Sequence, residues 1–138
     1  MRTVFLTAFA MASLTGGFLS PQRATEEGLK AEIPSPDYSK LKDVRDAKDW
    51  RNPMVLIRAN VVEVRSRSLP GGKIRISVGK LRRELINLPV SAWPYGRIVL
   101  AQDPGPSQGD DAAVRRTHDE TERILKALKV EADWWPPA

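Results

Sequence analysis

The turn segment LPGG, residues 69–72, restricts the fold of this chain more than any other feature. A proline followed by two glycines between apolar runs is a strong turn signal. Residues 54–66 before it, MVLIRANVVEVRS, are rich in β-branched residues, and KIRISV after it, residues 73–78, alternates polar with apolar side chains. Such alternation is typical of a half-buried strand. The region therefore predicts two or three antiparallel strands, with Asn60 as a turn or bulge in the first run.

Two helices and two more strands are predicted after this hairpin. Residues 77–89 carry apolar side chains on one helical face, with a serine as candidate N-cap and a proline as the stop. The apolar run GRIVLAQ, residues 96–102, is typical of a central strand buried on both faces. A second helix is expected from about Asp110 to Lys129, and VEADWWP, residues 130–136, alternates as an edge strand would. The predicted fold class is α+β, a small mixed sheet of four to five strands with two helices packed on one face.

The N-terminus has the features of an export signal. Arg2 precedes a stretch without charge, residues 3–22, and Pro21 ends any helix there. Small residues at cleavage-like spacing favour a signal peptide that is removed, whereas the length of the stretch, close to the roughly 20 residues that span a bilayer, leaves a retained anchor open. We therefore expect residues 1–20 to be a signal peptide or membrane anchor. The protein is predicted to be exported to the periplasm or the medium, with membrane contact through residues 3–22 if they stay uncleaved.

A polar linker is predicted over residues 21–52, ahead of one α+β domain over residues 53–138. From residue 22 on, the linker segment contains two prolines, Pro34 and Pro36, and charges of both signs, which do not favour a buried core. Within it, DYSKLKDVRDAKDW, residues 37–50, has only a loose helical spacing of apolar residues. A chain of 138 residues has room for one small core. Cysteine is absent, which excludes disulfides, thiolate metal sites and a lipid-anchored lipoprotein.

The order of these elements resembles the order found in a known family. The runs VLIRANVVEV, ISVGKLRREL, YGRIVLAQD and TERILKALKVEADWW, spread over residues 53–135, resemble the periplasmic domain of the ExbD/TolR family of energy-transducing envelope proteins. The resemblance is one of element order and includes no specific motif. It implies an envelope-domain fold behind an uncharged N-terminal segment and a linker. The membrane segment of that family carries an aspartate used in proton coupling, and residues 3–22 contain no ionisable side chain, so the motor function is not implied.

No set of residues predicts catalysis or metal binding. His118 is the only histidine, and we expect it to pair with Glu122 one helical turn away. The acids of the loop at residues 103–111 are better explained as helix-capping groups, and they would repel a phosphate. A P-loop, a GxGxxG motif and a nucleophile elbow are all missing from the sequence. We therefore predict a non-enzymatic protein with no catalytic, cofactor-binding or metal-binding residues and no cofactor.

Positive charge is concentrated in the middle of the chain. Residues 51–97 hold ten Lys or Arg against two Glu, a net charge of +8, whereas residues 98–138 carry −3. Such a run is often no more than a solvated surface, and its functional interpretation is an anionic partner, such as phospholipid headgroups, surface polysaccharide or an acidic protein. Nucleic acid fits the charge but not the export signal, so it is not predicted as a partner. The candidate interaction residues are Arg65, Lys73 and Arg75 on the solvent face of the strands and Lys80, Arg82 and Arg83 on the outer surface of the first helix.

Aromatic residues give a second group of candidates. Trp134 and Trp135 are adjacent on a strand and point to opposite faces, which leaves Trp135 to cover an edge or meet a partner. Trp93 and Tyr95 both lie at the start of a predicted strand and could stack on a sugar or peptide, although core packing explains most such residues. The predicted function is a non-enzymatic exported cell-envelope domain that acts through contacts with an unknown protein or an anionic surface. The alternative is a secreted hydrolase or a sugar-binding or small-ligand-binding module that uses the acidic loop and these aromatics.

Overall fold

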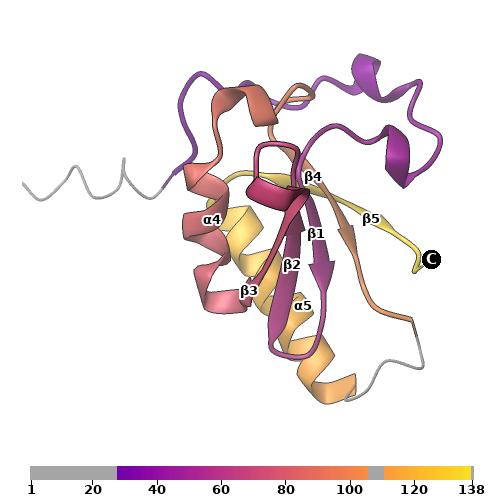
Figure 1. The fold of residues 1–138 in the computed structure, drawn as a ribbon, viewed down its shortest axis with the longest axis vertical. Coiled ribbons are helices and arrows are strands. Elements are labelled where there is room, and N and C mark those ends of the chain that lie inside the picture. Colours follow the sequence, from indigo (N-terminus) through magenta and orange to yellow (C-terminus); the bar gives the residue numbers. More distant parts are fainter. Residues whose placement is uncertain (1–27, 106–110, 138) are drawn as a thin grey trace, which may run out of the picture.

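The computed structural model describes residues 28–105 and 111–137, which form one mixed sheet with two helices (Figure 1). The predicted signal peptide or anchor, residues 1–20, lies outside the described residues. Within them, no helix combines the length and apolar character that crossing a bilayer requires. The predicted α+β class is confirmed. The strands are β1 (Met54–Ile57), β2 (Val61–Arg65), β3 (Lys73–Ser77), β4 (Ile98–Gln102) and β5 (Glu131–Trp135), and the helices are α4 (Leu81–Asn87) and α5 (Asp111–Ala127).

The strands lie side by side in the order β3-β2-β1-β4-β5. The pairs β1–β2 and β2–β3 are antiparallel, and the pairs β1–β4 and β4–β5 are parallel. Asn60 makes the first hairpin turn with a φ of 69°, a left-handed conformation that Asn tolerates better than most residues. The second hairpin turn places Gly71 and Gly72 at φ angles of 71° and 81°. The turn signal thus acts as predicted, and α5 supplies the crossover that the parallel neighbours β4 and β5 require.

The main core lies between the sheet and the two helices, which Figure 1 shows on one side of the sheet. Every second strand residue points to that side, and these residues are apolar. Residues 78–80 form a 3₁₀ turn before α4, so this helix is shorter than the predicted range of residues 77–89. The strand and helix side chains that fill the core include Val55 and Ile57 of β1, Val62 and Val64 of β2, Val99 of β4, Leu81 and Leu85 of α4, and Ile124 and Leu125 of α5.

Residues 28–52 differ from the predicted polar linker, because they pack onto the domain. Leu29 and Ile33 are buried in the main core, and Trp50 is buried in a second cluster on the opposite face of the sheet. The only helices in this segment are two short 3₁₀ turns, Tyr38–Leu41 and Ala47–Asp49. The buried side chains stand singly among charged residues, so they leave no periodicity that a sequence reading can detect. The folded unit therefore includes residues 28–52 as well as the predicted domain.

Two residues near the start of β4 hold this segment in place. The Arg97 Nε atom donates a hydrogen bond to the carbonyl of Ile33 at 2.9 Å. Gly96 has a φ of 86°, and a Cβ atom at this position would lie 2.4 Å from the carbonyl oxygen of Ser35. Only glycine allows so close an approach of two backbones. The YGR sequence before β4 thus positions residues 28–52 as well as starting a strand.

Candidate functional site

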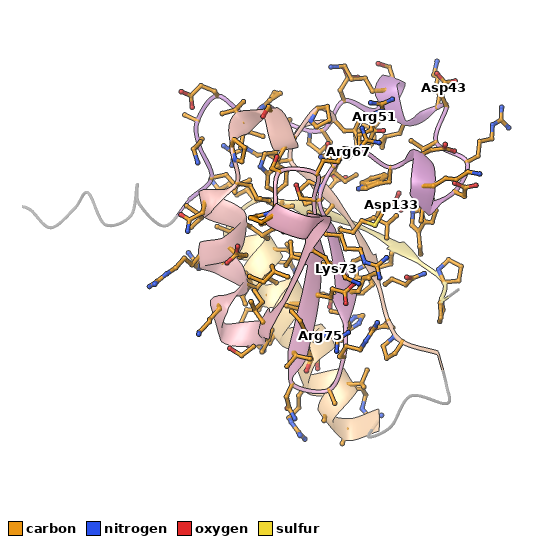
Figure 2. The ribbon with its side chains drawn as sticks, viewed as in Figure 1. Asp43, Arg51, Arg67, Lys73, Arg75 and Asp133 are labelled. Atoms are coloured by element: carbon orange, nitrogen blue, oxygen red, sulfur yellow. The ribbon has the colours of Figure 1, made fainter. Side chains whose placement is uncertain are left out.

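The sheet face opposite the helices carries the charged residues of β2 and β3. Glu63 and Arg65 alternate with the core valines of β2, so they point away from the helices. The strand register places Glu63 opposite Arg75 and Arg65 opposite Lys73. Figure 2 shows Lys73 and Arg75 along β3 on this open face. The structure therefore brings together the strand residues that the sequence singles out, Arg65, Lys73 and Arg75, and all three are exposed.

A buried carboxylate lies among these cations. The Glu63 side chain is only 3% exposed, and it accepts hydrogen bonds from Arg65 Nε at 2.5 Å and from Arg75 Nη2 at 3.2 Å. Burial by itself raises the pKa of Glu63, but the hydrogen bonds from the two guanidinium groups outweigh it, and the pKa lies below its usual value. Glu63 therefore stays ionised near neutral pH and orients both arginines.

Further cations adjoin this group at the end of β2. One hollow of about 420 Å³ is lined by the exposed residues Lys48, Arg51 and Arg67. Arg65 also lines it, and the whole lining comes from three segments of the chain. Figure 2 shows Arg51 and Arg67 near each other at the end of the sheet. We call the whole set the basic strand face. It consists of Lys48, Arg51, Arg65, Arg67, Lys73 and Arg75.

Sequence reasoning missed Lys48, Arg51 and Arg67 as candidates. Lys48 and Arg51 belong to the segment that was predicted to be a linker, and Arg67 lies in the turn after β2. Their proximity depends on the docking of residues 28–52 against the sheet. No local pattern in the sequence signals that docking, so these three could be found only from the fold.

The basic residues of the first helix form a separate group. Leu81 and Leu85 of α4 are buried against the helix side of the sheet, so α4 lies on the other side of the sheet from the basic strand face. Lys80 and Arg83 are exposed, Arg82 is half-buried, and Glu84 shares their surface hollow. The candidates Lys80, Arg82 and Arg83 thus do not join Arg65, Lys73 and Arg75 in one surface.

The aromatic candidates are packing residues rather than a stacking surface. Trp93 is 3% exposed in the main core, and Tyr95 is 5% exposed in the second cluster, where its hydroxyl donates to the carbonyl of Asp49. Trp135 is partly buried and makes an edge contact with Trp50, with ring centroids 6.3 Å apart. Burial therefore rules out the suggested stacking of Trp93 and Tyr95 on a ligand. Trp134 and Trp135 do point to opposite faces, because Trp134 packs against the main core.

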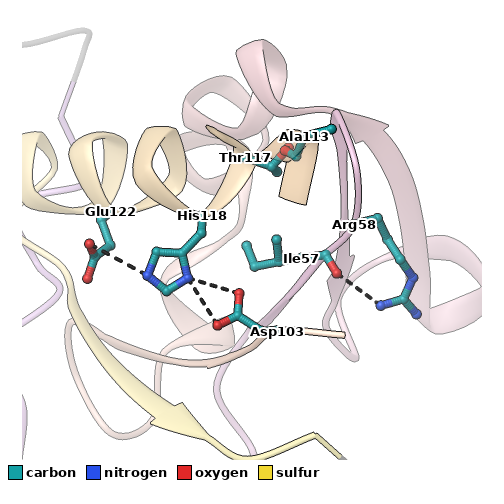
Figure 3. Close-up of polar contacts among 7 residues, drawn as sticks. All are labelled: Ile57, Arg58, Asp103, Ala113, Thr117, His118 and Glu122. Carbon is teal, nitrogen blue, oxygen red and sulfur yellow. Dashed lines mark hydrogen bonds and ion pairs between the residues drawn. The ribbon is translucent and has the colours of Figure 1, made fainter. Parts of the chain in front are cut away.

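His118 of α5 lies between two carboxylates, Glu122 of the same helix and Asp103 just after β4 (Figure 3). Its Nδ1 atom lies 2.9 Å from an oxygen of Asp103, and its Nε2 atom lies 3.7 Å from Glu122. The imidazole also stacks on Trp134, with centroids 4.1 Å apart. The predicted pairing with Glu122 is present, whereas Asp103 was missed because it reaches α5 from the end of β4. Asp103 occupies Nδ1, whereas Nε2 is too far from Glu122 for a hydrogen bond. Within the described residues, no hydroxyl group makes a hydrogen bond to Nε2 as a nucleophile would.

The acidic side chains near His118 on the same helix give little support for a metal site. His118, Asp119 and Glu122 could bring ligand atoms within 4.8 Å of one another, but the two acids are exposed and Asp103 and Glu122 already face the imidazole nitrogens. Exposed acids on a helix commonly serve solvation alone. Asp110 and the side chain of Asp111, the other acids of the predicted loop, lie outside the described residues.

Comparisons with protein-family models, with curated proteins and with solved structures find no match to this chain. The resemblance to the ExbD/TolR family therefore stays a prediction.

Proposed function

We propose that this chain is a non-enzymatic cell-envelope domain that contacts an anionic lipid surface through the basic strand face. The observation that carries the proposal is a continuous set of cations: Arg65 and Arg75 are paired with the buried Glu63, and Arg65 also lines one hollow with Lys48, Arg51 and Arg67. Placement in the envelope rests on the predicted export signal and on the resemblance to the ExbD/TolR domain.

The pairing of Glu63 leaves most of the positive charge available. One carboxylate is shared by two arginines, and the Arg65 and Arg75 side chains remain 47% and 64% exposed. Within the described residues, Lys48, Arg51, Arg67 and Lys73 make no ion pair. The face therefore presents fixed guanidinium groups beside cations with free donors, which suits recognition of oxyanions.

A lipid surface fits this face better than a protein partner. Protein interfaces usually centre on aromatic or aliphatic anchors. Among the described residues, the large apolar side chains that are exposed are Tyr38 and Val90, and neither belongs to the basic strand face. A face with positive charge and no apolar anchor is expected to bind mainly by electrostatic attraction, which anionic headgroups supply.

The alternative hydrolase function has less support. Within the described residues, no hydroxyl nucleophile makes a hydrogen bond to His118, and Trp93 and Tyr95 are buried rather than accessible to a ligand.

The test measures binding of the full chain to vesicles of phosphatidylglycerol and phosphatidylcholine as salt is raised. We expect a salt-sensitive component that disappears as the Debye length falls from about 10 Å at 0.1 M to about 3 Å at 1 M. The variant Arg51→Glu/Arg67→Glu/Lys73→Glu should lose this component. Arg65 and Arg75 are left unchanged because Glu63 depends on them.

The matched control is Lys80→Glu/Arg83→Glu/Arg116→Glu, which changes the net charge equally at exposed sites on α4, on α5 and in the 3₁₀ turn before α4. It should keep the salt-sensitive binding, since none of its sites lies on the basic strand face. Equal loss in the two variants would show that net charge rather than this face governs binding. An absence of salt-sensitive binding in the parent would reject the lipid surface and leave an acidic protein as the partner to examine.

A further inference from the structure

The hollow at the edge of the basic strand face has a lining suited to one particular anion. Its polar wall carries Lys48, Arg51, Arg65 and Arg67, and no Asp or Glu lines it among the residues that the structure describes. Trp50 and Met54 add an apolar wall. We infer that this hollow is a binding site for a phosphate group, which deepens the proposed function and rests on it.

The donors of the hollow match the chemistry of a phosphate. Arg51 and Arg67 each present a planar fork of N–H groups that fits two phosphate oxygens, and Lys48 adds a third positive charge. Apolar walls such as Trp50 lower the local dielectric constant and strengthen each charged contact. A phosphate group presents tetrahedral acceptor oxygens, with one negative charge as a lipid diester and up to two as a monoester or free phosphate, and uses this set of donors more fully than a planar carboxylate would.

A neutral donor completes the set. Ser66 lines the hollow and is only 9% exposed. Its Oγ atom accepts a hydrogen bond from the backbone N–H of Ser68 at 3.2 Å, and within the described residues no acceptor takes its hydroxyl proton. A buried hydroxyl with an unused proton is uncommon, and a bound oxyanion would satisfy it.

Glu63 pairs with Arg65, but within the described residues Lys48, Arg51 and Arg67 make no ion pair with an acid. Asp43 and Asp49 line an adjoining hollow that shares Lys48, Arg51 and Arg67. The Oδ2 atom of Asp49 accepts from the backbone N–H groups of Arg45 and Asp46, so this carboxylate is occupied in capping a 3₁₀ turn. The phosphate would therefore lie on the β2 side of the cations, away from both acids.

The first experiment titrates the full chain with inorganic phosphate and follows amide NMR shifts, against sodium chloride of equal ionic strength. We expect shifts at residues 48–51 and 65–67. Arg51→Gln/Arg67→Gln should weaken phosphate binding by about tenfold or more, and Ser66→Ala by about threefold to tenfold. The control Lys80→Gln/Arg83→Gln should bind as the parent does. Equal affinity in the two double variants, or shifts no larger than chloride produces, would overturn the inference.

Two further titrations identify the source of the phosphate. Glycerol 3-phosphate tests a soluble ester, and vesicles of phosphatidylglycerol test a lipid headgroup. Loss of vesicle binding in the uncharged change Ser66→Ala as well as in Arg51→Gln/Arg67→Gln assigns the hollow to the headgroup, whereas loss in the arginine variant alone reflects the charge of the face. Phosphate binding in the hollow without any vesicle binding supports this inference and rejects the proposed surface. If the parent chain binds vesicles but does not bind inorganic phosphate, the proposed lipid contact is supported and the phosphate site in the hollow is rejected.

Discussion

The two faces of the sheet are built from alternate residues of the same strands, yet they are stabilised in different ways. On the helix face, Val62 and Val64 of β2 are fully buried among apolar side chains. On the open face, the residue between them, Glu63, is equally buried but depends on two arginines. Burial on the helix face thus removes apolar area from water, whereas burial of Glu63 fixes charges that remain exposed. A residue's buried fraction alone does not say which of these roles it has.

The open face is itself divided. Near β4 and β5, Ile98 and Leu100 are covered by Trp50, Tyr95 and Trp135. Near β2 and β3, the arginines cover Glu63 and no apolar cluster forms among the described residues. A second layer from residues 28–52 therefore protects one half of the face and leaves the other half open for contact.

The largest effect is expected in the core of the helix face. Leu85 is fully buried, so Leu85→Ala should lower the free energy of unfolding by about 2 to 5 kcal/mol through lost burial and a residual cavity. Chemical denaturation of the full chain measures it. The exposed Lys73→Ala is the control and should stay within about 0.5 kcal/mol of the parent. A Leu85→Ala effect no larger than the control's would mean that α4 does not pack as described.

A smaller but substantial loss is expected when charge is reversed beside Glu63. Arg75→Glu would place a second carboxylate against a buried one and should cost about 2 kcal/mol, less than a fully buried pair because Arg75 is 64% exposed. Arg83→Glu on α4 makes the same change at an exposed site and should cost less than about 0.5 kcal/mol. Similar unfolding free energies for these two variants would contradict a structural role for the Glu63 pairs.

The pH dependence of stability gives a third comparison. The pKa of Glu63 is lower in the folded chain than its usual value of 4.5, so its contribution is present above that pH and is lost as the pH falls through the folded value. Glu63→Gln should cost about 1 kcal/mol at neutral pH. The difference between parent and variant, measured by urea unfolding, should shrink below pH 4.5. A difference that stays constant down to pH 3 would mean that Glu63 carries no special charge interaction.

The smallest effect on stability is expected at the hollow. Arg51 and Arg67 are exposed and make no ion pair within the described part of the chain, so Arg51→Gln/Arg67→Gln should change the unfolding free energy by less than about 0.5 kcal/mol. Thermal melts of parent and variant check this. A loss above about 1 kcal/mol would make these arginines structural and would remove the argument for a ligand.

Local patterns in the sequence predicted most of the sheet and both helices. The LPGG turn, the alternation of β3 and the apolar stripe of α5 each depend on neighbours in the chain, so their signals are strong. The docking of Leu29 and Ile33 was missed because single apolar residues carry no period. The contact between Asp103 and His118 was missed for a related reason, since it joins residues fifteen positions apart from different elements.

The candidate site was only partly predictable. The strand alternation placed Arg65, Lys73 and Arg75 on one face, because a period of two needs no knowledge of the fold. The same reasoning could not separate them from Lys80 and Arg83, whose side of the sheet is decided by how α4 packs. Strand alternation also could not predict that Arg51 lines the hollow, because Arg51 lies outside the strands.

The central claim is that the basic strand face, and not the helices, meets an anionic lipid surface. The most direct test is amide NMR of the full chain with and without lipid nanodiscs that contain phosphatidylglycerol. We predict that signals of β2, β3, the turn at residues 66–72 and residues 48–51 broaden most, and that they recover when salt is raised to 1 M. Broadening centred on α4 or α5, with the strand residues unchanged, would contradict the claim.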